Sequence, residues 1–302
     1  MVPNSRAGIN KRLFCKRENV LAMAALRVGR KSLVKRYSDK TRSLLKMAAA
    51  LPDRPSPDEI HDLRVAVRRV QMMRRLVPRR VGGSSQDSKS FDLALRSVMK
   101  VTSQLRDMDT LMDTLKSYKG TLSTELLVNL ENRRSDAAAR AKAGIIALAK
   151  TMTPEVDISK VRGKRLSKRL RKRVQRHSNL ASAMLAGVLK DESKAEELHS
   201  LRKEIKKIRY LIELADKTPA RFSSLAEWQQ SLGAIHDLDV AISYLKAAGA
   251  DPNRRAILEL RKARHSNYLK FVRDHGTAQM QTLREWGALP LGLLVNVSPT
   301  EA

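Results

Sequence analysis

The chain has 302 residues, and 42% of them are hydrophobic, so it can bury one large core or two smaller ones, while no apolar run approaches the roughly 18 residues of a membrane span. Its 60 Lys and Arg residues against 31 Asp and Glu leave a net charge of +29, an excess that indicates a polyanionic partner such as nucleic acid, an anionic membrane or inorganic polyphosphate. The single cysteine, Cys15, excludes an internal disulfide and a thiolate metal cluster and fits a reducing compartment. An aromatic content of 4% disfavours a protein that binds single strands by stacking their bases on aromatic side chains.

Helical periodicity runs through most of the first half and stops at clusters of proline and glycine. Apolar residues recur at helical spacing from about Glu18 to Ala50 and predict one long helix, which three closely spaced prolines must end. Ser56 or Asp58 can cap the next helix. After a loop at residues 82–85, the pattern predicts helices over these ranges: 91–101, about 104–118, and 122–151.

The second half repeats this order after a break at Thr153 and Pro154. Helices are expected over 158–189, from about 199 to 216, over 222–233 continuing to 248, and over 254–275. An apolar run at residues 20–26 only weakly resembles a signal peptide, because Arg27 ends it, and the start of the first helix is the preferred interpretation. No stretch alternates with period 2, which predicts an all-α protein.

One basic helical sequence occurs twice. His61-Asp62-Leu63-Arg64 opens the first copy and His199-Ser200-Leu201-Arg202 opens the second. At 3.6 residues per turn, the basic side chains of each copy fall on one side of the helix and the apolar ones behind them. The basic sides comprise His61, Arg64, Arg68 and Arg75 in one copy and His199, Arg202 and Lys206 in the other. Two such helices at matching places could direct their cationic sides toward one shared groove, which is the candidate functional site.

A second landmark also occurs twice, as Arg106-Asp107-Met108-Asp109 and as His236-Asp237-Leu238-Asp239. Both landmarks appear in the same order at nearly equal separations, which indicates a duplicated unit. Carboxylates two residues apart on a helix point about 200° away from each other, which disfavours a shared metal ion. We expect the four aspartates to cap helices or to accept salt bridges from the basic helices, with divalent-ion binding as the alternative.

These two motifs, each present twice and in order, resemble the CHAD domain, the histidine α-helical domain. The resemblance covers residues 15–285, as a single domain of two halves (about 15–152 and 155–285) with tails at 1–14 and 287–302. It implies two four-helix bundles related by a pseudo-two-fold axis around a basic cavity. It also implies non-enzymatic binding of inorganic polyphosphate and a cytoplasmic location, in some members on polyphosphate granules. The Glu-x-Glu-x-Lys signature of the triphosphatase domain often fused to this family is absent.

The histidines and cavity bases of the family correspond here to His61, Arg64, Arg68, Arg69, His199, Arg202, Lys206 and Lys207. The expected site is completed by Arg75, Arg106, Arg165 and Arg169. Arginine offers a fork of N–H donors to phosphate and lysine a mobile point charge, so a ladder of both suits a linear polyanion. The halves differ chemically, because Ser200 replaces the acid at Asp62 and Arg106 stands where the other half has His236. The two motif histidines could instead bond carbonyls or carboxylates within the bundle.

The densest run of positive charge, residues 162–173, supports an alternative function. Leu166, Leu170 and Val174 give this run an apolar stripe. Its basic side could form a second wall of the cavity, a nucleic-acid patch on the outside, or a solvated helix face. Nucleic acid is therefore a secondary candidate partner.

An enzymatic alternative rests on the His-Asp pairs, which resemble the metal pair of an HD phosphohydrolase. That chemistry needs further histidines around two metals, and His177, His265 and His275 do not obviously supply them. Gly163-Lys164 lacks the preceding glycine and strand of a phosphate-binding P-loop. We therefore expect no catalytic residue, no cofactor and no metal site, and the sequence does not define an oligomeric state.

Overall fold

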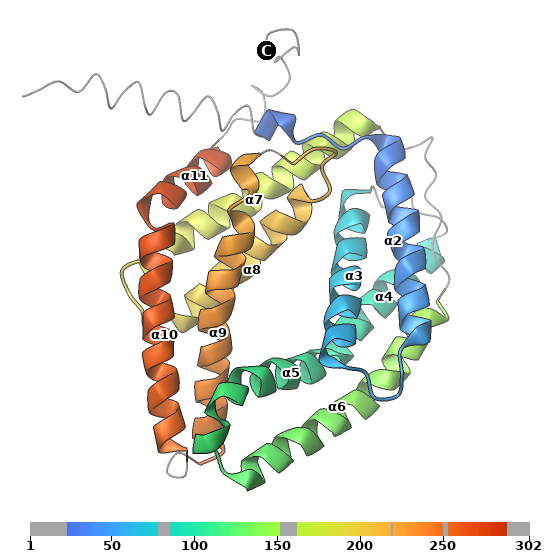
Figure 1. The fold of residues 1–302 in the computed structure, drawn as a ribbon. Coiled ribbons are helices and arrows are strands. Elements are labelled where there is room, and N and C mark those ends of the chain that lie inside the picture. Colours follow the sequence, from blue (N-terminus) through green and yellow to red (C-terminus); the bar gives the residue numbers. More distant parts are fainter. Residues whose placement is uncertain (1–22, 78–84, 152–161, 219, 250–252, 289–302) are drawn as a thin grey trace, which may run out of the picture. The chain divides into compact units, whose positions relative to one another are not determined.

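The computed structural model describes residues 23–77, 85–151, 162–218, 220–249 and 253–288, and every regular element within them is a helix (Figure 1). The prediction of an all-α protein is confirmed. The α-helices are α2 (Arg30–Ala50), α3 (Pro57–Leu76), α4 (Ser85–Val101), α5 (Ser103–Leu115), α6 (Thr124–Ala149), α7 (Gly163–Val188), α8 (Ala195–Ile212), α9 (Leu225–Ala247), α10 (Arg254–His275) and α11 (Thr277–Ala288). The described residues also include two 3-10 helices, η2 (Lys116–Thr121) and η4 (Ala220–Phe222), and a short helical stretch at residues 23–25.

The expected helix from residue 18 to 50 is wrong in one respect, because residues 26–29 interrupt it. The backbone N–H of Val28 donates to Ser167 Oγ at 3.1 Å, and that of Gly29 donates to Asp216 Oδ2 at 2.7 Å. Side chains distant in sequence thus replace the helical hydrogen bonds, and the chain becomes helical again at Arg30. The part of the expected helix before residue 23, with the signal-peptide-like residues 20–22 and the tail 1–14, lies outside the described residues.

Helix α11 was not predicted from the sequence. It follows α10 directly after Gly276, and its Leu283 and Trp286 are buried. Its last turn contacts α7, where Gln175 Nε2 donates to the Gly287 carbonyl oxygen at 3.0 Å. A Cβ atom at Gly287 would lie 1.6 Å from Asn179 Oδ1, so glycine permits this close approach. Residues 287 and 288, expected to begin a tail, instead belong to α11, and the rest of that tail lies outside the described residues.

The chain forms two compact units, each discontinuous in sequence. Unit 1 comprises the described residues within 1–29, 163–233 and 267–302, and unit 2 those within 30–162 and 234–266. In these units residues 234–266 group with 30–162, and the described residues up to 29 group with 163–233. The single domain of two sequential halves stays a prediction. The pseudo-two-fold relation stays a prediction.

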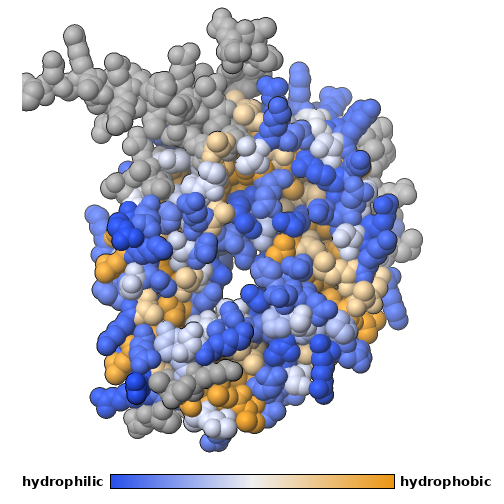
Figure 2. Space-filling model, viewed as in Figure 1, coloured by the Kyte–Doolittle hydropathy of each residue, from blue (hydrophilic) through white to orange (hydrophobic). Residues whose placement is uncertain are grey.

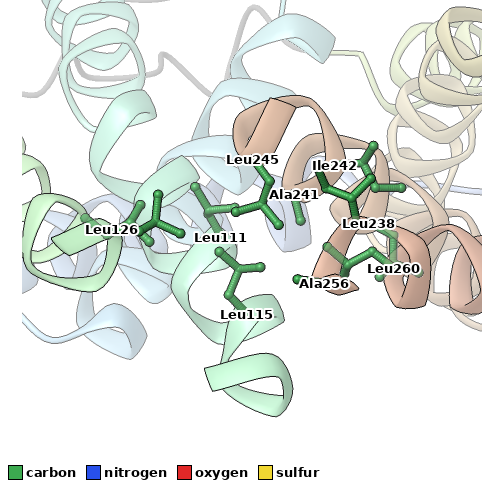
Figure 3. Packing of buried hydrophobic residues seen from close by; sticks show 11 residues of the cluster. Leu111, Leu115, Leu126, Leu238, Ala241, Ile242, Leu245, Ala256 and Leu260 are labelled. Carbon is green, nitrogen blue, oxygen red and sulfur yellow. The ribbon is translucent and has the colours of Figure 1, made fainter. Parts of the chain in front are cut away.

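The core of unit 2 joins helices from both of its segments (Figure 3). Leucines from α5 and α6 pack with apolar residues of α9 and α10, and the cluster comprises Leu111, Leu115, Leu126, Leu130, Leu238, Ala241, Ile242, Leu245, Ala256, Ile257 and Leu260. Elsewhere in the unit, α2 packs on α3 and α6, and α4 packs on α6. This packing determines which side of α3 and α5 remains available to a ligand.

Unit 1 is built around α7, which packs against α8 and α11. The buried side of α7 carries Leu166, Leu170 and Val174, the apolar stripe seen in the sequence. The ring of Phe222 lies 4.3 Å from that of Trp286 between centroids, and Tyr268 Oη donates to the Val188 carbonyl oxygen at 2.9 Å. Helix α7 therefore has one fully buried side, and its basic residues occupy the other sides.

Candidate functional site

The first cationic helix, α3, starts with a reciprocal capping box. Ser56 Oγ accepts from the backbone N–H of Glu59 at 3.2 Å, and Glu59 Oε2 accepts from the backbone N–H of Ser56 at 2.7 Å. The helix buries Leu63 and Val67 on its apolar side. On the other sides, the predicted site residues range from exposed to buried: His61 and Arg75 are exposed, Arg68 and Arg69 are half-buried, and Arg64 is buried.

Arg64 is anchored at the junction of α4 and α5. Its side chain is only 7% exposed, and Nη1 donates to the Met99 carbonyl oxygen at 2.9 Å and to Thr102 Oγ1 at 2.7 Å. Burial lowers the pKa of Arg64 to about 10, and the nearby charge of Arg68 acts in the same direction. Arg64 therefore remains a cation at neutral pH, and the two oxygens to which it donates are uncharged.

Three cations and one carboxylate on α3 and α5 act electrostatically on one another. The positive charges of Arg68 and Arg106 both lower the pKa of Arg64, and the negative charge of Asp107 raises it. Partial desolvation raises the pKa of the Asp107 carboxyl, while Arg64 opposes that rise. We name these four residues, Arg64, Arg68, Arg106 and Asp107, the α3–α5 cluster. Its net positive charge makes it a site that an anion would stabilise.

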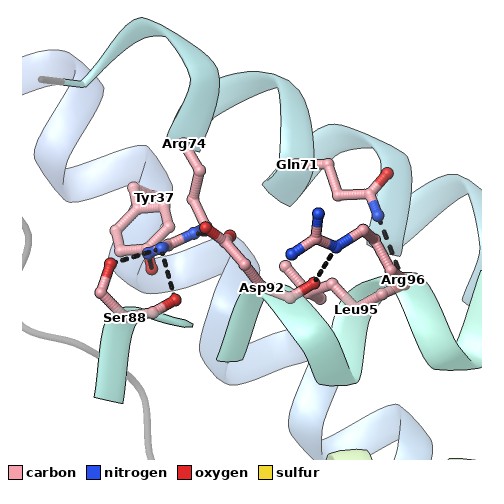
Figure 4. A network of polar contacts seen from close by, with 7 residues as sticks. All are labelled: Tyr37, Gln71, Arg74, Ser88, Asp92, Leu95 and Arg96. Atoms are coloured by element: carbon pink, nitrogen blue, oxygen red, sulfur yellow. Dashed lines mark hydrogen bonds and ion pairs between the residues drawn. The ribbon is translucent and has the colours of Figure 1, made fainter. Parts of the chain in front are cut away.

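Not every arginine of α3 can be a ligand, as Arg74 shows (Figure 4). Its guanidinium bonds Asp92 through Nε, Tyr37 Oη through Nη1 at 3.2 Å, and Ser88 Oγ through Nη2 at 2.8 Å. These contacts tie the C-terminal end of α3 to α2 and α4. Arg74 therefore has a structural role, and its neighbour Arg75 is exposed.

The second cationic helix, α8, starts at Ala195, and its N-cap residue, Lys194, makes no side-chain capping hydrogen bond. His199, Arg202 and Lys206 are all half-buried. The guanidinium of Arg202 lies against α9, since a Cβ atom at Gly233 would be 3.6 Å from Arg202 Nε. Burial, followed by the charges of Lys203 and Arg202, lowers the pKa of His199. Its imidazole is therefore neutral at pH 7 until an anion approaches it.

A buried carboxylate on α8 was not predicted from the sequence. Glu204 is 8% exposed; its Oε2 lies 2.6 Å from His177 Nδ1 on α7, and its Oε1 accepts from Lys207 Nζ. Lys207 and His177 together lower the pKa of Glu204 against the opposing effect of burial. Ala66 occupies the matching position in α3. Lys207, an expected phosphate ligand, is thus already paired with an acid.

The second aspartate of each Asp-x-Asp motif forms a buried ion pair. Arg134 Nε bonds Asp109 Oδ1 at 2.7 Å, and Arg264 Nε bonds Asp239 Oδ1 at 2.8 Å. Both partners follow 25 residues later in the chain. The arginines belong to α6 and α10, rather than to the basic helices that were expected to supply them. This repeated spacing is a third landmark of the duplication, and the sequence alone contains it.

The remaining predicted residues lie on α7 and α9. Arg165 and Arg169 are exposed, on the side of α7 opposite its buried leucines. By contrast, Arg171 is half-buried, and its Nη1 donates to the Leu26 carbonyl oxygen at 3.4 Å. On α9, His236 and Asp237 are half-buried.

Neither a metal-binding group of side chains nor a membrane-spanning helix is found in the described part of the chain. No group of three or more His, Cys, Asp or Glu side chains there could hold a metal ion. None of the helices described is long and apolar enough to cross a membrane.

Hydrophilic side chains dominate the face seen in Figure 2, with hydrophobic ones between them in smaller areas. Hydrophilic side chains are therefore the main chemical feature that this face presents.

Comparison with known proteins agrees with the motifs. The family model of the CHAD domain matches residues 38–246. The fold is similar to the crystal structure of the CHAD domain from the plant Ricinus communis, with a TM-score of 0.52 and 17% sequence identity over 88% of this chain and 94% of the plant chain. No curated protein sequence matches the chain significantly. Because the family model covers more than half of the residues, the chain belongs to the CHAD domain family.

Proposed function

We propose that this protein binds inorganic polyphosphate through the cationic sides of α3 and α8, without catalysis of its own. The proposal extends to a cytoplasmic location on polyphosphate granules. The observation that carries it is the α3–α5 cluster, where Arg68 and Arg106 lie close enough to Arg64 to lower its pKa. Among the described residues, the carboxylate that acts on Arg64 in the opposite direction is Asp107.

Polyphosphate suits this arrangement for two chemical reasons. Each phosphate unit carries about one negative charge, so a bound segment would relieve the repulsion among the three arginines. Polyphosphate also lacks bases, so a binding surface for it needs no aromatic platform of the kind used for single-stranded nucleic acid.

The first test is binding of labelled long-chain polyphosphate to the wild type and to the Arg68→Ala/Arg106→Ala variant. These two side chains are half-buried, whereas replacing the buried Arg64 would also disturb the fold. At about 0.15 M salt we expect affinity to fall about tenfold or more, and the slope of log affinity against log salt to decrease by roughly 1.4, for two lost phosphate contacts. The matched control is Arg261→Ala/Lys262→Ala, which removes two exposed cations of α10 in the same unit.

Equal losses in the variant and the control would show that binding depends on total charge and would overturn the proposed site. Circular dichroism must show the same helix content in all three proteins. The absence of catalysis has its own test, in which phosphate release from polyphosphate is measured with and without a chelator. We expect no release in either condition, and release that a chelator abolishes would favour the metal-dependent phosphohydrolase.

A further inference from the structure

The exposed side of α7 carries an unusually uniform charge. Five residues of α7 lie within about a third of a turn of one another and are all exposed: Arg165, Lys168, Arg169, Lys172 and Arg176. We name this set the α7 stripe. The helix contains no Asp or Glu and no aromatic residue from Gly163 to Val188. At 1.5 Å per residue the stripe is about 16 Å long.

The stripe is held rigidly by the opposite side of the same helix. Leu166, Leu170 and Val174 are buried against the rest of unit 1, and His177 is fixed by Glu204 of α8. Arg171, which lies off the stripe, is instead turned toward the backbone at Leu26. The cations of the stripe therefore point outward from a fixed support, at steps of about one helical turn.

The form of the stripe selects among possible anions. A small anion needs donors that converge, and these five project in a row along one helix. A single nucleic-acid strand would be stacked on aromatic side chains, and α7 has none. An anionic membrane is bound by an amphipathic helix that inserts its apolar side, but the apolar side of α7 is already buried. A row of cations on a rigid rod matches the phosphates along one strand of a duplex.

We propose that the α7 stripe binds double-stranded nucleic acid through its backbone phosphates, without reading its sequence. This surface is a second site, and it does not depend on polyphosphate binding by α3 and α8. Because α7 cannot detach from its leucine core to enter a groove, contacts to base edges are not expected, and affinity should be the same for unrelated sequences.

The test compares two full-length variants with the same change in net charge. The stripe variant is Arg165→Glu/Lys168→Glu/Lys172→Glu/Arg176→Glu, and the control is Arg254→Glu/Arg261→Glu/Lys262→Glu/Lys270→Glu on α10, where all four residues are also exposed. Fluorescence anisotropy would report binding to a labelled duplex of about 24 base pairs, in two unrelated sequences, across a series of salt concentrations. The stripe variant should lose at least about thirtyfold in affinity and about 3 to 4 in salt slope, while the control loses less than about threefold.

Several outcomes would overturn this proposal. The first is an equal loss of duplex affinity in the stripe variant and the control. The second is tighter binding of single strands than of duplex by the wild type. The third is a stripe variant that loses binding to anionic vesicles but keeps its duplex affinity. The Arg68→Ala/Arg106→Ala variant separates the two proposals, since it should keep duplex affinity while losing polyphosphate. The stripe variant should lose duplex affinity, and wild-type protein holding labelled polyphosphate should still bind the duplex.

Discussion

The two cationic helices share a motif but hold their charges differently. On α3, the buried Arg64 donates to an uncharged carbonyl and a hydroxyl. The position of α3 that corresponds to Glu204 of α8 is occupied by Ala66. On α8, the matching part of the sequence contains Glu204, which pairs with Lys207. A second acid, Glu213, occupies the position of Arg75 and lies 3.6 Å from Arg209 Nε.

The difference shows that the number of basic residues does not measure the field that a helix presents. Neutral acceptors fix the position of Arg64 and leave its charge in place, whereas Glu204 and Glu213 cancel part of the charge of α8. We therefore expect the α3–α5 cluster in unit 2 to contribute more to anion affinity than the cationic side of α8 in unit 1.

The largest contrast between the two copies should appear at their buried ion pairs. Asp109 has a fully buried side chain, while that of Asp239 is 24% exposed. Asp109→Ala leaves the nearly buried Arg134 without its acid and should lower the free energy of unfolding by about 3 kcal/mol or more. Asp239→Ala should cost about 1–2 kcal/mol, because water can replace part of the contact. Urea unfolding of both variants checks this, and equal losses would contradict it.

The two motif arginines should differ by a smaller amount. Arg64→Met removes a buried cation together with its two hydrogen bonds and should lower the free energy of unfolding by about 2 kcal/mol. Arg202→Met, at a half-buried position, should cost less than about 1 kcal/mol. Chemical denaturation measures both. A larger loss for Arg202→Met would show that α8, rather than α3, uses its arginine as an anchor.

The helix starts offer a way to make the two copies more alike. Ser56→Ala breaks the capping box of α3 and should lower the free energy of unfolding by about 1 kcal/mol. Lys194→Asp gives α8 the side-chain cap that it lacks and should raise that free energy by about 0.5–1 kcal/mol, with help from the helix dipole. The midpoint temperature of thermal unfolding should fall for Ser56→Ala and rise for Lys194→Asp. Shifts of both midpoints in the same direction would exclude the explanation by capping.

The smallest effect should be a pH dependence that originates in α8. The pKa of His199 is lowered in the free protein, and a bound polyanion would raise it. Polyphosphate affinity should therefore rise, by about threefold, as pH falls from the bound pKa to the free pKa, and should become constant below the free value. Titration calorimetry at several pH values measures this. His199→Gln should remove most of the dependence, and an unchanged profile would assign it elsewhere.

Helix positions could be predicted from the sequence where they depend on a local pattern. The predictions were wrong or incomplete where contacts with residues distant in sequence determine the structure. The prolines and Ser56 define the start of α3, and the helix predicted from Arg254 to about His275 agrees with α10. The break at residues 26–29 depends on Ser167 and Asp216, which no local pattern reveals. The roles of Arg64 and Glu204 depend in the same way on tertiary partners, Thr102 and His177. Sequence periodicity places a side chain on one side of a helix, but it does not show what the side chain meets there.

The bonds that residues 28 and 29 make with Ser167 and Asp216 have a consequence for how this protein folds as it is synthesised. These contacts join positions 139 and 187 residues apart, and unit 1 also requires residues from 267 onward. Unit 2 likewise remains incomplete until residues 234–266 have been translated. Most of the chain must therefore leave the ribosome before either unit can close its core, while α2 to α7 wait with apolar sides exposed. The high positive charge keeps such partly folded chains apart, and this protection weakens as salt screens the repulsion.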